Sequence, residues 1–143
     1  MKTTYRNTAF FVEVLVCIVV FSIAGAILAG AFGKASMAVR QTQEESLAGS
    51  EMYALVETYR ARGQAGLAEG EALSGGGLAF AYAENWQQVQ AGGGVYTVTL
   101  FIQPQQRAGG VLSQITAVAT RSDGTEIYRL ETAVYRPGEG GLA

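Results

Sequence analysis

Few residues in this chain belong to the types that usually carry out catalysis or bind metal ions. The sequence has no histidine, a single cysteine and a single aspartate, Asp123. Histidine, cysteine and aspartate supply most general bases, nucleophiles and transition-metal ligands in proteins. Serine and glutamate are present, but none stands at a spacing that is typical of a catalytic pair. We therefore expect a protein that is not an enzyme and has no cofactor and no metal site.

Charge and cysteine content exclude two further classes. The chain has 10 Lys and Arg against 12 Asp and Glu, a net charge of −2, without a basic patch. Nucleic-acid binding therefore has no electrostatic support. The only cysteine, Cys17, lies in a long apolar run, so the rest of the chain has no thiol for a disulfide or a thiolate metal site.

The chemically unusual group is Glu13, a carboxylate inside the apolar run 9–33, AFFVEVLVCIVVFSIAGAILAGAFG. The 20 residues 14–33 carry no formal charge. At about 1.5 Å per residue they reach about 30 Å, the thickness of the bilayer hydrocarbon core. The 14 Leu, Ile, Val and Phe residues in the range 10–32 favour insertion by roughly 6 kcal/mol, against the cost of about 3 kcal/mol for a central carboxylate. We expect a transmembrane helix over 9–33, with a functional role for Glu13.

Residues 1–8, MKTTYRNT, precede the apolar run as a short polar leader with Lys2 and Arg6. Positive charge on this side predicts a cytoplasmic N-terminus and a C-terminal domain across the inner membrane. Two alternatives remain at this point, an uncleaved anchor and an ordinary signal peptide cleaved after Ala31, because Ala29-Gly30-Ala31 is a small-x-small sequence.

Small residues recur every four positions in the second half of the apolar run. They form two rows, Gly25, Ala29 and Gly33 in one and Ser22, Ala26 and Gly30 in the other. Such rows let helices approach closely in lipid, so we expect Gly25, Ala29 and Gly33 to pack against another helix. The alternative is the general abundance of Gly and Ala in membrane helices.

Helical periodicity continues beyond the apolar run, over residues 34–62. An apolar stripe recurs at i, i+4, i+7 and i+11, formed by Ala48, Met52, Leu55 and Tyr59 and flanked by Leu47 and Val56. The opposite face is expected to carry Glu44, Glu45, Glu51, Glu57 and Arg60. Without a proline before Pro104, we predict one helix of about fifty residues that ends near Arg62-Gly63, half of it in lipid and half amphipathic.

The remainder divides into a connector and a sheet. Residues 63–94 contain two Gly-Gly-Gly sequences and are predicted to be a flexible connector, although 78–82 (LAFAY) also fits a short strand or a helical turn. Trp86 is expected to pack against the core. Residues 95–143 show period-two alternation in three runs, the last two joined by Asp123-Gly124, which indicates an antiparallel β-meander. We predict an α+β fold in which the long N-terminal helix packs on a C-terminal antiparallel sheet of 3–4 strands, because one apolar sheet face needs a cover.

The stretch 10–21, FFVEVLVCIVVF, resembles the N-terminal signature of type IV pilins and type II secretion pseudopilins. Its 12–16 core is especially similar to the minor-pilin and minor-pseudopilin classes. The resemblance covers about 25 residues. It implies a pilin-like fold, an N-terminal helix on an antiparallel sheet, which agrees with the fold predicted from periodicity.

The resemblance also implies processing by a membrane-embedded prepilin peptidase, which removes the leader and methylates the new N-terminus. A cut between Thr8 and Ala9 places Glu13 at mature position five, where the family carries its glutamate. A cut between Ala9 and Phe10 restores a small residue before the cut but moves Glu13 to position four. We favour the first cut. In this family the glutamate is thought to neutralise the N-terminal ammonium of a neighbouring subunit.

Three departures favour a minor subunit over a major one. The membrane helix has no proline, the C-terminal region has no disulfide loop, and Asp123 alone does not suggest an Asp-rich calcium site. The expected function is that of a structural subunit of a type IV pilus or type II secretion pseudopilus. Its expected partners are other pilin or pseudopilin subunits, the prepilin peptidase and the inner membrane. The alternative is a small binding domain, membrane-anchored or secreted, that is unrelated to filaments.

Overall fold

The computed structural model describes residues 2–90 and 92–138. The chain divides into two compact units, Met1–Thr42 and Gln43–Ala143. Residue 1 of the predicted leader, residue 91 of the predicted connector and residues 139–143 of the predicted meander lie outside the described residues.

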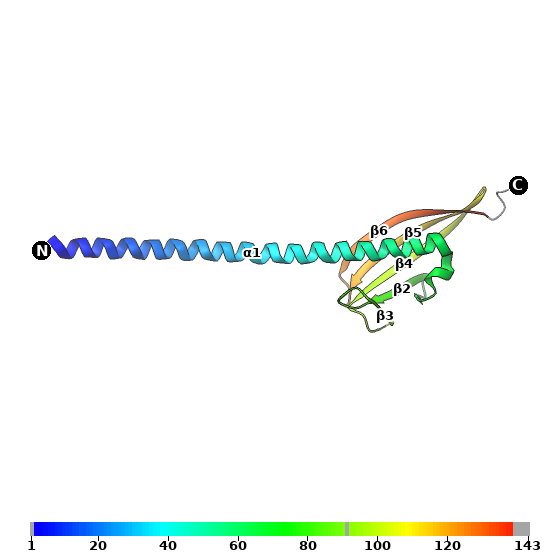
Figure 1. Ribbon diagram of the computed structural model, residues 1–143, viewed down its shortest axis with the longest axis horizontal. Helices are drawn as coiled ribbons and strands as arrows, with labels where there is room; N and C mark the ends of the chain where they lie inside the picture. Colours follow the sequence, from blue (N-terminus) through cyan, green and yellow to red (C-terminus); the bar gives the residue numbers. More distant parts are fainter. Residues whose placement is uncertain (1, 91, 139–143) are drawn as a thin grey trace. The chain divides into compact units, whose positions relative to one another are not determined.

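Helix α1 spans Lys2–Arg62, 61 residues, without interruption (Figure 1). Its residues up to Thr42 belong to the first unit, and its residues from Gln43 onward belong to the second. The predicted helix is confirmed, and it also includes residues 2–8 of the expected leader. All side chains described from Thr8 to Thr42 are exposed. An apolar helix with no cover of its own is unfavourable in water, so this half of α1 requires lipid or protein around it.

Helix α1 ends where the sequence predicts, at Arg62. The next residue, Gly63, has a φ of +65°, a left-handed conformation that glycine adopts without steric cost. The 3-10 helix η1, Gly63–Leu67, then leads toward the sheet. The end of the helix is thus set by a glycine at the position after the last helical residue.

The second unit contains a six-stranded antiparallel sheet in the order β1-β2-β4-β5-β6, with β3 also paired to β2 (Figure 1). Its strands are β1 Glu71–Ala72, β2 Gly77–Tyr82, β3 Gln88–Val89, β4 Tyr96–Arg107, β5 Gly110–Arg121 and β6 Glu126–Pro137. The three long strands form the predicted meander. The turn between β5 and β6 has Gly124 in the left-handed region, as the Asp-Gly sequence indicates.

The sheet is larger than the expected 3–4 strands because the connector 63–94 is not a flexible loop. It contributes η1 and the strands β1, β2 and β3. Strand β2 pairs with β4 along its whole length, from Gly77↔Phe101 to Tyr82↔Tyr96. This long-range pairing, together with burial of Phe80 and Tyr82, outweighs the local preference of the surrounding glycines for irregular structure.

The core lies between one face of α1 and one face of the sheet. It comprises Ala48, Met52, Val56, Tyr59, Leu67, Phe80, Tyr82, Trp86, Tyr96, Val98, Leu100, Ile115, Ala117, Ala119, Leu130 and Val134. The helical stripe and the apolar faces of β4, β5 and β6 are therefore confirmed, as is the packing of Trp86. Tyr59 adds a polar contact inside this core, a hydrogen bond of 2.8 Å between its hydroxyl and that of Ser113.

Two details of the stripe were predicted wrongly. Leu47 was expected to flank the buried face, but it is exposed. Glu44 was placed on the opposite, polar face, yet it lies four residues before Ala48 and contacts β4 and β5. Because residues at i and i+4 share a helix face, Glu44 is the first member of the stripe that the sheet covers.

Adjacent residues of α1 provide a test of this packing. Met52 is fully buried, whereas Tyr53 beside it is 56% exposed. Met52→Ala is expected to lower the free energy of unfolding by about 2–5 kcal/mol, because it leaves a cavity in the core. Tyr53→Ala, the control, is expected to change it by less than about 0.5 kcal/mol. Denaturant unfolding followed by the fluorescence of Trp86, the only tryptophan, gives both values. Equal effects of the two variants would contradict the assigned helix face.

Candidate functional site

The N-terminal half of α1 is a candidate membrane span. Among the described residues one helix, Thr8–Leu67, is long and apolar enough to cross a membrane. Its largest side chains stay exposed, with Phe10 at 63% and Phe21 at 78%. The span therefore fits the expected transmembrane helix by length and composition.

The predicted processing and assembly residues lie on consecutive turns of this helix. Thr8, Ala9 and Phe10 are helical, and Thr8 has an interaction of its own within the chain. Glu13 follows Ala9 by four residues, so both lie on the same face, one helical turn apart. Glu13 is exposed, and no salt bridge of its carboxylate occurs among the described residues.

The small residues Gly25, Ala29 and Gly33 lie along one side of α1, as their four-residue spacing requires. Apart from the helix's own neighbouring backbone, a methyl group added at Gly25 or Gly33 would have no atom of the described residues within 4 Å. The structure brings these residues together as a row but contains no helix packed on it. The row remains a predicted packing surface.

Glu44, which was expected on the polar face of the helix, lies in a polar cluster that we did not predict. One carboxylate oxygen of Glu44 accepts a hydrogen bond of 3.2 Å from the Tyr96 hydroxyl, and the other accepts a hydrogen bond from Arg121. Glu44 raises the pKa of the Arg121 guanidinium, chiefly through the hydrogen bond. Burial, followed by the negative charge of Glu44, raises the pKa of Tyr96. Only the i, i+4 relation of Glu44 to Ala48 could have pointed to this cluster.

Aromatic side chains extend the cluster into the β2–β3 turn. The ring of Tyr96 stacks on Trp86 with a centroid separation of 4.5 Å and an interplanar angle of 10°. Tyr82 lies on Trp86 as well, at 5.8 Å. Trp86 has a φ of +59°, which is rare for a bulky side chain and costs backbone energy. The two aromatic contacts hold Trp86 in this conformation.

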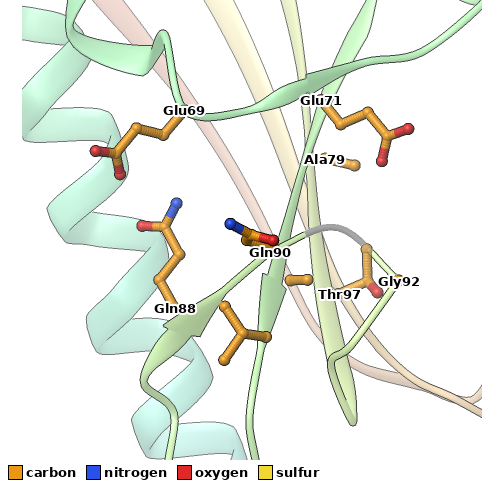
Figure 2. Close-up of a pocket in the computed structure, with 9 residues that line it drawn as sticks. Glu69, Glu71, Ala79, Gln88, Gln90, Gly92 and Thr97 are labelled. Carbon is orange, nitrogen blue, oxygen red and sulfur yellow. The ribbon is translucent and has the colours of Figure 1, made fainter.

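A cavity of about 220 Å³ lies beside the strand β3. Figure 2 shows Glu69 and Glu71 on one rim and Gln88 and Gln90 across from them. Ala79, Ala81 and Thr97 also line the cavity. Because Ala79 and Ala81 alternate with the buried Phe80 and Tyr82, the cavity lies on the face of the sheet opposite the core. It offers carboxylate, amide and hydroxyl groups for hydrogen bonding but no nucleophile–base pair.

In the part of the chain that the structure describes, no group of three or more His, Cys, Asp or Glu residues could hold a metal ion.

Comparisons with protein-family models, with curated proteins and with solved structures found no match.

Tyr82 is expected to make the second unit less stable as the pH rises above 10. Burial, with a smaller contribution from the charge of Glu51, raises the pKa of Tyr82 from 10.0 to about 12. The folded state therefore holds this proton more tightly than the unfolded state, a stabilisation that is complete below pH 10 and is lost as the pH rises through about 12. We expect the stability of the wild type to fall over this range by up to about 1.4 kcal/mol per pH unit from this group.

The measurement is denaturant unfolding at pH 8, 10 and 11, compared between the wild type and Tyr82→Phe. The variant lacks the titrating hydroxyl and is expected to show a shallower decline. Parallel declines in the two proteins would mean that Tyr82 does not carry the effect.

Proposed function

We propose that this chain is a structural subunit of an inner-membrane filament, a minor pilin of a type IV pilus or a minor pseudopilin of a type II secretion system. The observation that carries the proposal is the exposed carboxylate of Glu13 within an otherwise apolar, uncovered helix. A lone carboxylate is costly in lipid, and a cation from a neighbouring subunit offsets that cost. The N-terminal resemblance to pilins and pseudopilins names the class of assembly.

The proposed cation is the N-terminal ammonium that the prepilin peptidase creates. A carboxylate and an ammonium about 4 Å apart attract by roughly 4 kcal/mol at an effective dielectric constant of 20. This attraction exceeds that in water about fourfold and fixes the axial position of one helix against the next. Glu13 thereby sets the register between subunits.

The two halves of α1 support this role in different ways. Residues 48–59 bury their apolar stripe against the chain's own sheet, and this contact completes the hydrophobic core of the second unit. Residues 9–33 have apolar surface on every side and no cover within the chain. An element that is apolar all round and uncovered suits a helix that is stored in a bilayer and then packed among other helices. The proposed orientation has a cytoplasmic N-terminus and an extracytoplasmic sheet.

A membrane-anchored binding domain, unrelated to filaments, is the second candidate function. The cavity lined by Glu69, Glu71, Gln88 and Gln90 favours it, because polar groups converge there on an uncovered sheet face. In that case Glu13 would be a carboxylate near the end of an ordinary anchor, without a role in contacts between subunits.

Glu13→Ala separates these two functions. In native cells the variant is expected to enter the membrane as the wild type does, because the apolar run is retained. Its chemical cross-linking to other pilin-like subunits is expected to fall by about tenfold or more, since the charge pair is lost. Membrane fractionation and immunoblots of cross-linked products give both quantities.

Ser22→Ala is the matched control, because Ser22 is another polar residue of the same apolar run and bonds only to the backbone of its own helix, at Ile18. It is expected to cross-link as the wild type does. Normal cross-linking of Glu13→Ala would contradict the register role and favour the anchored binding domain.

A further inference from the structure

The polar cluster at Glu44 touches three different parts of the second unit. Glu44 belongs to α1, two residues into this unit, while Tyr96 begins β4 and Arg121 ends β5. Both carboxylate oxygens of Glu44 are engaged, one by each partner. The first sheet-covered turn of α1 is therefore held by charge-assisted hydrogen bonds, which are stronger and more directional than apolar contacts.

Tyr96 contacts both Glu44 and the β2–β3 hairpin. Its hydroxyl is bonded to Glu44, and its ring stacks at 4.5 Å on Trp86. The Trp86 amide donates a 2.9 Å hydrogen bond to the Ala83 carbonyl, and the Ala83 amide donates one of 2.9 Å to Gln87. The Tyr96 ring thus contacts a residue, Trp86, of the turn that precedes β3.

The backbone of Trp86 adopts an unfavourable conformation. At a φ of +59° it is held in the left-handed region, although non-glycine residues with large side chains favour negative φ. Such strain persists only where surrounding contacts maintain it. Loosening the stack on Tyr96 removes one of the two aromatic contacts and lets this turn relax.

We propose that Glu44 is a conformational latch, whose hydrogen bonds to Arg121 and Tyr96 couple the first covered turn of α1 to the β2–β3 hairpin. The hairpin's strand β3 supplies Gln88 and Val89 to the cavity wall (Figure 2). When Glu44 holds Tyr96, the hairpin is closed and the cavity has the shape described. When α1 withdraws Glu44, Trp86 leaves the left-handed region and the cavity wall moves. This coupling is independent of the filament role proposed for Glu13.

The test compares hydrogen exchange of the Ala83 and Trp86 amides in the full chain, held in detergent micelles, among the wild type, two single variants, their double variant and a control variant. Glu44→Gln removes the charge, and Tyr96→Phe removes the hydroxyl while keeping the ring and leaving Arg121 in place. Each is expected to speed exchange of both amides by about tenfold or more, since Glu44→Gln removes the charge that strengthens both hydrogen bonds and Tyr96→Phe removes the hydroxyl that donates one of them. The double variant is expected to show no more than the larger single effect, because both substitutions break the same link. Emission of Trp86 is expected to move to longer wavelength in parallel.

Glu57→Gln is the control, because Glu57 lies on the same helix and pairs only with Arg60, three residues away. It is expected to leave the hairpin amides unchanged. The latch is overturned if Glu44→Gln speeds exchange near residue 44 but leaves Ala83 and Trp86 as in the wild type. Additive effects in the double variant, or an equal effect of Glu57→Gln, would also overturn it.

Discussion

The structure depends on one packing constraint, the need of a single-layer sheet to cover its apolar face. Strands β4, β5 and β6 each present alternate apolar residues to the same side, and the stripe of α1 from Ala48 to Tyr59 covers them together with Leu67 and Trp86. Burial of apolar surface stabilises a fold by about 25 cal/mol per Å², so covering this face favours folding of so small a domain. The Tyr59–Ser113 and Glu44–Arg121 hydrogen bonds then fix where the helix lies along the sheet.

The same helix carries a second apolar surface that the chain leaves uncovered. Burying one half of α1 in its own domain stabilises that domain without using residues 9–33. Those residues are then available for lipid or for neighbouring helices, and Glu13 is the one residue among them with a formal charge. This division of one helix between folding and assembly is the physical basis of the proposed filament role.

Periodicity predicted the long elements because their apolar residues face one uniform surface. For that reason, the sequence pattern predicted both the apolar stripe of α1, which has a period of about 3.6 residues, and the alternation of Tyr96, Val98 and Leu100 in β4. The short strand left open for residues 78–82 is observed as β2, Gly77–Tyr82. It is fixed by pairing with β4, far away in the sequence, so the local pattern alone did not distinguish it from a loop or a helical turn. Glu44 was misplaced because a carboxylate on a buried stripe is explained only by Arg121, 77 residues later. The role proposed for Glu13 depends on a partner subunit, so no ion pair among the described residues could identify it.

The most direct test of the proposed function is the mature N-terminus of the protein, determined by intact mass and terminal peptide mapping after isolation from its native membrane. A chain that starts at Ala9 or Phe10 and carries one added methyl group is the expected result, and it would also decide between the two cleavage positions. A chain that starts at Phe32 would indicate an ordinary signal peptide. A chain that retains Met1 would indicate a plain anchor, and either of these last two results would contradict the account.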